Sequence, residues 1–212
     1  LGAEKLRDLI YRSGAANLGA NGIPTESGSA KITPDDIAGV IVSLIDDDIL
    51  NPDPMILLDS LRLDRFIEGV NILGAAFPKA TVTVAISGGY QRLTSRIESG
   101  VSGTNVQIVQ VGGKYPQSHE AILVQSVTGQ PYPYGVAAIH SGFVLLDGQA
   151  PVHVCNAVTD GLPVTHRRVA IGGPHIEEPG HIDVAIGTPV AEVISISDDN
   201  EHETRIVLDS LM

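Results

Sequence analysis

Apolar residues recur with a helical period in several segments of the chain and gather in short β-branched runs in others. Leu6, Leu9 and Ile10 share one face of a helix that the spacing predicts over residues 3–13. The same criterion predicts a long amphipathic helix over 57–73, which ends at Gly74. It also predicts three shorter helices, over 90–98, 120–127 and 149–159. Runs rich in Val and Ile predict strands over 38–45, 81–86, 105–111 and 142–146. Strands alternating with helices in this way are typical of a doubly wound, mostly parallel α/β sheet.

The pattern changes at Val164, where apolar and polar residues begin to alternate strictly up to Ala170. A turn rich in Gly and Pro follows, and then come a second strand, a short helix and a third strand, over 181–186, 190–194 and 206–208. Two strands followed by a short helix are typical of the start of a β-grasp unit. We therefore expect two units, residues 1–163 and 164–212. The second is expected to be incomplete, since residues after Met212 would be needed to close its sheet, and the start at Leu1 suggests a domain taken from a longer chain.

Composition narrows the class of protein. Of the 212 residues 43% are apolar and only 4% aromatic, so the core must be built from Val, Ile, Leu and Ala, as in parallel sheets flanked by helices. The net charge is −12 and no basic run exists, which argues against nucleic acid and against direct binding to anionic membranes. No stretch approaches the about 20 apolar residues of a membrane span. Cys155 is the one cysteine, which excludes an intrachain disulfide or a cysteine-ligated iron–sulfur cluster within this chain.

Two glycine-containing strings are candidates for cofactor binding. Residues 12–25 carry three glycines and Pro24, and glycine lets backbone approach a ligand closely, although such a loop is more often a plain connection. Residues 112–120 read GGKYPQSHE. They do not form a phosphate-binding P-loop, because Tyr115 stands where the magnesium-binding hydroxyl should be. Glu120 opens a predicted helix, where an acid is also an ordinary partner of the helix dipole.

Metal-binding candidates are weaker. The run Asp46–Asp48 follows a predicted strand, where it is either a Mg²⁺ ligand set or a solvated turn. His175 and His181 flank two glutamates, but no pair of histidines at helical spacing accompanies them. We expect the chain to bind no metal on its own.

Three strings together resemble one family. The stretch Asn17–Thr25 resembles the G-L-G-G-A-G-F-P-T loop that holds the flavin in the C subunit of Rnf electron-transport complexes and in the NADH-binding subunit of respiratory complex I. Asn17 and Ala20 replace two of its glycines. Residues 114–120 resemble the K-Y-P-Q-G-G-E-K motif of the Rnf protein, with Ser118 and His119 in place of its glycines. The tail over residues 161–189 also resembles the family: Gly161-Leu162-Pro163 resembles the G-K-P that ends its flavin domain, and residues 164–189 resemble the start of the soluble-ligand-binding β-grasp (SLBB) domain that follows.

The resemblance covers about residues 5–195 and implies a Rossmann-like flavin/NADH-dehydrogenase domain over 1–163, followed by an SLBB-like segment over 164–212. We also expect Leu18–Ile23 to lie at the carboxyl end of the sheet, in contact with Lys114–Glu120, because a doubly wound fold brings its strand-end loops to one crevice. In place of the family's E-C-E-P string stands N-P-D-P, which keeps one acid. The cofactor-binding residues that the resemblance implies are Leu18, Gly19, Ala20, Asn21, Gly22, Lys31, Asp53, Tyr115 and Glu120.

Two functions remain open. One is an electron-transfer module that binds FMN, takes hydride from NADH and passes electrons to iron–sulfur clusters in other subunits of a membrane-associated redox complex. Such a module is expected to be cytoplasmic, held at the inner face of the membrane through its partners. The other is a binding or assembly domain that has lost the flavin. Because side chains replace two loop glycines, we expect FMN binding that is weak or lost.

Overall fold

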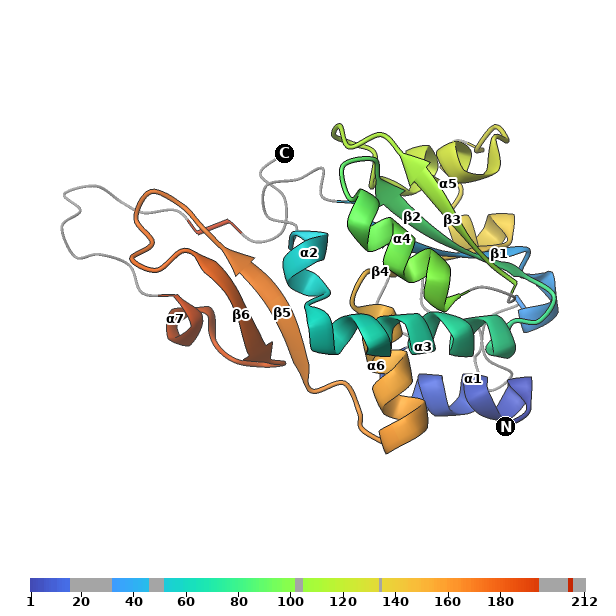
Figure 1. Ribbon diagram of the computed structural model, residues 1–212, viewed down its shortest axis with the longest axis horizontal. Helices are drawn as coiled ribbons and strands as arrows, with labels where there is room; N and C mark the ends of the chain where they lie inside the picture. The colour runs from blue at the N-terminus through green and yellow to red at the C-terminus, as the bar shows by residue number, and fades with distance from the viewer. Residues whose placement is uncertain (16–31, 46–51, 102–104, 134, 195–205, 208–212) are drawn as a thin grey trace.

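Four strands form a parallel sheet at the centre of the structure: β1 (Gly39–Leu44), β2 (Thr81–Ser87), β3 (Val106–Val111) and β4 (Phe143–Asp147). This computed structural model describes residues 1–15, 32–45, 52–101, 105–133, 135–194 and 206–207. The strand order is β3-β2-β1-β4, and every neighbouring pair is parallel (Figure 1). The inner strands are rich in Val and Ile because both of their faces are covered. The predicted doubly wound parallel sheet is confirmed.

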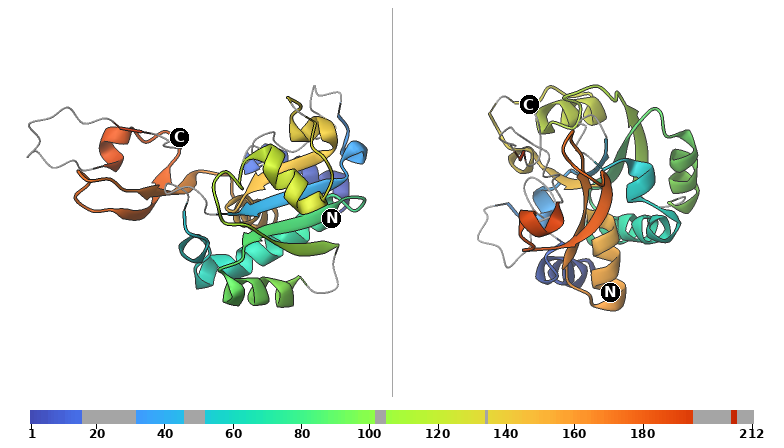
Figure 2. Two further views of the ribbon diagram at one scale, coloured as in Figure 1. Left: turned by 90° about the horizontal axis from the view of Figure 1, so that it is seen from above. Right: turned by 90° about the vertical axis from the view of Figure 1, so that its left-hand side faces the viewer.

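Helices cover the two faces of the sheet unequally (Figure 2). On one face Val40 and Val42 of β1 pack in the larger apolar core, together with side chains of α1 (Ala3–Arg12), α3 (Ser60–Ala76), α4 (Gln91–Gly100) and α6 (Ala150–Cys155). On the other face Ile41 and Ile45 pack against α5 (Glu120–Thr128) and the 3₁₀ turn η3 (Ala138–Ser141). Neighbouring residues of a strand point to opposite faces, so β1, β2 and β4 each contribute side chains to both cores.

The long helix predicted over 57–73 is confirmed as α3, but its bounds are shifted by three residues and a separate short helix precedes it. The short helix α2 (Pro54–Leu57) begins where the Asp53 carboxylate accepts a hydrogen bond from the Met55 N–H at 2.7 Å. The helix α3 begins where Asp59 accepts one from the Arg62 N–H at 3.1 Å. Asp is a strong N-cap, so Asp59 starts a new helix instead of continuing the old one. The helix α3 then passes through Gly74 and ends at Ala76.

The other helix ends follow their sequence signals. The helix α5 ends at Gly129 and the π-helical turn η4 (Asn156–Asp160), which continues α6, ends at Gly161; both glycines have a positive φ. Before β1 lies the 3₁₀ turn η2 (Pro34–Asp36), which is capped by Thr33. Among the helices of the described residues, none has the length and apolarity needed to cross a membrane.

A β-hairpin extends from one side of the α/β unit, with β5 (His166–Ile171) antiparallel to β6 (Gly180–Ala185) and the short helix α7 (Val190–Val193) beyond it (Figure 1). The predicted strand–strand–helix order is thus confirmed. Ile206 and Val207 are the described part of the expected third strand, and they do not belong to a strand. Leu208 lies outside the described residues.

Candidate functional site

A pocket lies at the carboxyl ends of β1 and β4. The chain passes from β1 outward to β2 and β3 on one side and returns to place β4 on the other, so these two strands flank the point where the strand order reverses. Open α/β sheets bind their ligands in the crevice at this point. The pocket has a volume of about 320 Å³, and its walls are formed by Ser43, Leu44, Ile45, Pro52, Pro54, Leu57, Ser118, Glu120, Leu123, Leu145, Leu146, Asp147, Gly148, Gln149 and Arg167.

Asp147 is the last residue of β4 and organises the start of α6. Its Oδ1 accepts hydrogen bonds from the N–H groups of Gln149 at 3.0 Å and Ala150 at 2.9 Å, as an N-cap carboxylate does. Its Oδ2 forms an ion pair with Nη2 of Arg167 from the hairpin strand β5. One carboxylate therefore joins β4, α6 and β5 at the wall of the pocket.

Gly148 lies between the end of β4 and the wall of the pocket that β1 and α2 form. A Cβ there would be 2.6 Å from Cδ2 of Leu44 and 2.9 Å from Cδ2 of Leu57. Both atoms are the ends of leucine side chains, which can move, whereas the Ser43 carbonyl oxygen at 3.2 Å belongs to the backbone. A side chain at this position therefore requires the leucines of the pocket wall to shift.

Glu120 forms another part of the wall and is hydrogen-bonded within the protein. Its Oε1 lies 2.6 Å from the Tyr132 hydroxyl and also accepts the Ala138 N–H, so the carboxylate ties α5 to η3. Burial and the Glu120 carboxylate together raise the pKa of Tyr132 far above its usual range, which keeps the hydroxyl protonated as a donor. The acid thus combines a place in the pocket with a structural contact.

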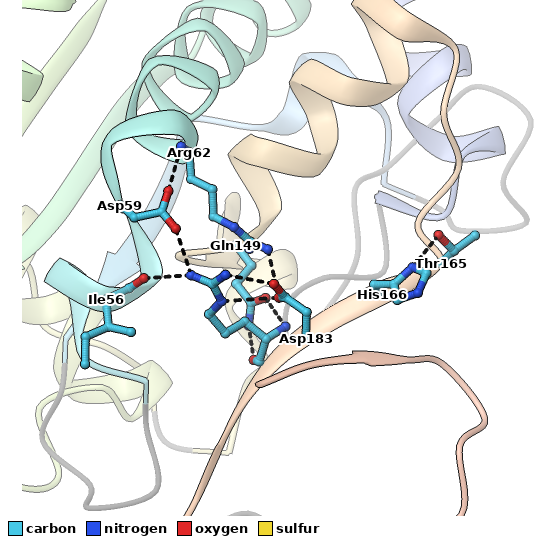
Figure 3. A network of polar contacts seen from close by, with 8 residues as sticks. Ile56, Asp59, Arg62, Gln149, Thr165, His166 and Asp183 are labelled. Carbon is cyan, nitrogen blue, oxygen red and sulfur yellow. Dashed lines mark hydrogen bonds and ion pairs between the residues drawn. The ribbon is translucent and has the colours of Figure 1, made fainter. Parts of the chain in front are cut away.

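Two polar side chains hold the hairpin against the α/β unit beside the pocket (Figure 3). Gln149, 5% exposed, donates from Nε2 to the Arg168 carbonyl at 2.8 Å and accepts the Arg168 N–H at Oε1 at 2.8 Å, as a neighbouring strand would. The Arg168 guanidinium bonds both oxygens of Asp183 at 3.2 and 2.7 Å, Asp59 at 3.1 Å and the Ile56 carbonyl at 2.9 Å. The contact therefore joins β5, β6 and the α2–α3 corner.

Hydrogen bonds and charge shift the acids of this network. The hydrogen bond from Arg168 lowers the pKa of Asp183, with Arg62 adding to the effect through a 2.8 Å ion pair. Burial alone would raise the pKa of Asp59, but hydrogen bonds from Arg168 and from the Arg62 N–H outweigh it and lower that pKa. Both carboxylates are therefore charged at neutral pH and hold the hairpin electrostatically.

The residues implied by the family resemblance lie in different places. Glu120 lines the pocket. Asp53 caps α2 and accepts the Tyr90 hydroxyl at 3.2 Å, while the prolines on either side of it line the pocket. Tyr115 is 46% exposed and lies outside the pocket lining. The predicted contact between Leu18–Ile23 and Lys114–Glu120 lies outside the described residues. So do the remaining residues implied by the resemblance, which are Leu18, Gly19, Ala20, Asn21, Gly22 and Lys31.

Sequence reasoning missed the pocket residues Asp147, Gln149 and Arg167. The position of Asp147-Gly148-Gln149 directly after a buried strand was a usable signal, because strand ends meet at one edge of a parallel sheet. For Arg167 no local signal existed. The candidate metal ligands Asp46–Asp48 lie outside the described residues. Within the described part of the chain, no three or more His, Cys, Asp or Glu side chains are grouped so that they could hold a metal ion.

A parallel sheet in this strand order, with a pocket at its reversal point, defines an open α/β domain of the class that binds ligands at that point. Residues 14–159 match the family described as the Nuo51 FMN-binding domain, and the chain belongs to that family. This is the family of the complex I NADH-binding subunit and the Rnf C subunit, so the kinship expected from the sequence is confirmed.

Two curated relatives show the same kinship at low identity. The chain is 26% identical over 198 residues to the C subunit of the ion-translocating oxidoreductase complex of Salmonella paratyphi A, covering 91% of this chain and 26% of the relative. It is 25% identical over 198 residues to the protein of the same name in Salmonella gallinarum, covering 91% of this chain and 28% of the relative. The chain thus spans about a quarter of the length of these relatives.

Two solved structures share the fold. A chain of NAD+-reducing NiFe hydrogenase in the H2-reduced state superposes with a TM-score of 0.63 at 15% identity, covering 91% of this chain and 41% of that one. The air-oxidised state of such a hydrogenase gives a TM-score of 0.59 at 17% identity, covering 92% and 41%. At these identities the likeness supports the fold.

Proposed function

We propose that this chain is an electron-transfer domain of an Rnf-like or complex-I-like NADH-oxidising complex, with its flavin site in the pocket between β1 and β4. The observation that carries the proposal is the position of that pocket. It lies at the reversal point of the sheet, and all its lining residues except Arg167 fall within the 14–159 match to an FMN-binding domain family. The curated relatives are subunits of ion-translocating oxidoreductase complexes, which supports partner subunits for this chain as well.

The chemistry of the pocket fits a flavin. Leucine, isoleucine and proline side chains form apolar walls, and Glu120, Gln149 and Arg167 are among the polar residues of the lining. Its volume of about 320 Å³ is within the range of small-molecule sites. FMN supplies two-electron chemistry towards NADH and one-electron chemistry towards iron–sulfur clusters, while the protein binds and orients it. We place the dividing line between the flavin domain and the SLBB-like segment after residue 163, and the domain on the cytoplasmic side of its complex.

The second candidate is a binding or assembly domain that has lost the flavin, and the sequence of the glycine loop favours it. Asn17 and Ala20 stand where the family has glycine. A side chain pressed against a packed ligand costs about 1–3 kcal/mol, so two replacements weaken binding roughly a hundredfold or more. In this second candidate the domain serves assembly of the complex and carries no electrons.

A titration of FMN into the purified chain, followed by quenching of flavin fluorescence, separates the two candidates. We expect weak but saturable binding, and tighter binding in the double variant Asn17→Gly with Ala20→Gly. Absence of binding in both proteins would refute the flavin site. Tight binding by the unaltered chain would refute the crowding argument. The matched control is Gly88→Ala, which adds a side chain in open space.

A further inference from the structure

Two consecutive arginines of β5 have opposite surroundings. Every nitrogen of the Arg168 guanidinium has an acceptor, from Asp183, Asp59 and the Ile56 carbonyl, and the side chain is only 16% exposed. Arg167 lines the pocket and is 31% exposed, and among the described residues its guanidinium has one partner, Asp147. A guanidinium carries five N–H donors, so several of those on Arg167 are available to a ligand.

The two acids of the pocket are already supplied with donors. Glu120 accepts hydrogen bonds from the Tyr132 hydroxyl and the Ala138 N–H. Asp147 accepts two backbone N–H groups of α6 and pairs with Arg167. Among the charged side chains of the described lining, Arg167 is therefore the one with unused capacity, and that capacity is for an anion.

We propose that Arg167 binds the phosphate of the flavin nucleotide in this pocket, which makes the hairpin part of the flavin site. The inference rests on the proposed function. A guanidinium binds phosphate through two parallel N–H···O bonds, which a point charge cannot reproduce. The phosphate uses the Arg167 donors left over from Asp147, while the apolar walls contact the ring system.

The neighbouring contacts explain how a residue outside the α/β unit reaches the pocket. Gln149 pairs with the backbone of Arg168 through two 2.8 Å hydrogen bonds, which fixes the position of β5 one residue away from Arg167. Side chains of adjacent strand residues point to opposite sides. With Arg168 anchored at the α2–α3 corner, Arg167 is directed at the pocket. Gln149 and Arg168 are thus positioning residues, and Arg167 touches the ligand.

FMN and riboflavin differ only by the phosphate, so the ratio of their dissociation constants measures the phosphate contact. We expect the unaltered chain to bind FMN about tenfold more tightly than riboflavin, as one charge-assisted contact provides. In Arg167→Gln the ratio falls to about one because FMN affinity drops while riboflavin affinity is kept. Arg167→Lys retains the positive charge but not the two parallel N–H donors, so we expect its preference for FMN over riboflavin to be reduced but not abolished. Both constants are also measured in the Asn17→Gly/Ala20→Gly background, where binding is tighter.

The matched control is Arg12→Gln, which removes the same charge from an exposed ion pair with Asp8 in α1, outside the pocket. It is expected to leave the ratio unchanged. An unchanged ratio in Arg167→Gln would overturn the inference while leaving the flavin site in place, and so would equal losses of FMN and riboflavin affinity. Binding of neither flavin in any background would overturn the proposed function and this inference with it.

Discussion

The crossing of α3 and α6 depends on a glycine, and replacing it gives the sharpest test of the fold. A Cβ at Gly69 would lie 1.8 Å from the carbonyl oxygen of Pro151, 2.5 Å from its carbonyl carbon and 2.9 Å from its Cα. Real Cβ atoms essentially never come within 3.0 Å of such atoms. The variant Gly69→Ala therefore forces the helices apart by at least the difference between 3.0 and 1.8 Å, because no rotamer change moves a Cβ or a backbone carbonyl.

Two opposing effects determine how much Gly69→Ala changes the free energy of unfolding. Alanine is favoured over glycine inside a helix by about 1 kcal/mol. Against this, a gap of about 0.5–1 Å costs a quarter to a half of the dispersion energy of the separated atoms, and overpacking typically costs about 1–3 kcal/mol. Here the new Cβ meets main-chain atoms of Pro151 next to the buried Val70, Phe66 and Val152, so the upper part of that range applies. The net loss of unfolding free energy is about 2 kcal/mol.

Thermal and urea unfolding measure this loss. For a chain of this size about 2 kcal/mol corresponds to a fall in Tm of about 4–8 °C. The control Gly88→Ala places its Cβ in open space and is expected to change the free energy of unfolding by less than about 0.5 kcal/mol. An unchanged or higher Tm in Gly69→Ala would show that the helices do not cross this closely. Since α6 begins directly after the pocket residues, we also expect weaker flavin binding in this variant.

Two further predictions concern the hairpin and the pH dependence of stability. Arg168→Gln leaves Asp59 and Asp183 without their main cation and is expected to cost about 1–2 kcal/mol, with faster amide hydrogen exchange in β5 and β6; unchanged exchange there, relative to an Arg12→Gln control, would contradict the proposed anchor. Burial, with a further contribution from the positive charge of Arg167, lowers the pKa of His153, so the folded state disfavours its protonation. Unfolding free energy should then decrease as pH falls below the unfolded-state pKa of about 6.5, by at most about 1.4 kcal/mol per pH unit and only down to the folded-state pKa. His153→Gln should flatten the unfolding free energy between pH 7 and 5, and an identical pH profile in that variant would refute the assignment.

Local patterns predicted most of the secondary structure correctly. The strands β1 to β4, the hairpin and the glycine ends of α5 and η4 all follow from signals within a few residues in the chain. The long helix predicted over 57–73 starts three residues later than expected, and the reason is also local, because Asp59 caps the first turn of α3. The likeness of three short strings also led to the correct family.

The sequence by itself therefore determined the elements, the class of sheet and the kinship of this protein, because each depends on residue types at short spacing. Only the tertiary structure decided the composition of the pocket. Asp147 forms an ion pair with Arg167, which lies 20 residues further along the chain, and Arg168 contacts Asp59 across a separation of 109 residues. These contacts exist because β4 lies beside β1 and the hairpin then folds back against the α2–α3 corner. Burial of apolar surface and saturation of buried polar groups across the whole chain determine that arrangement, and no local spacing encodes it.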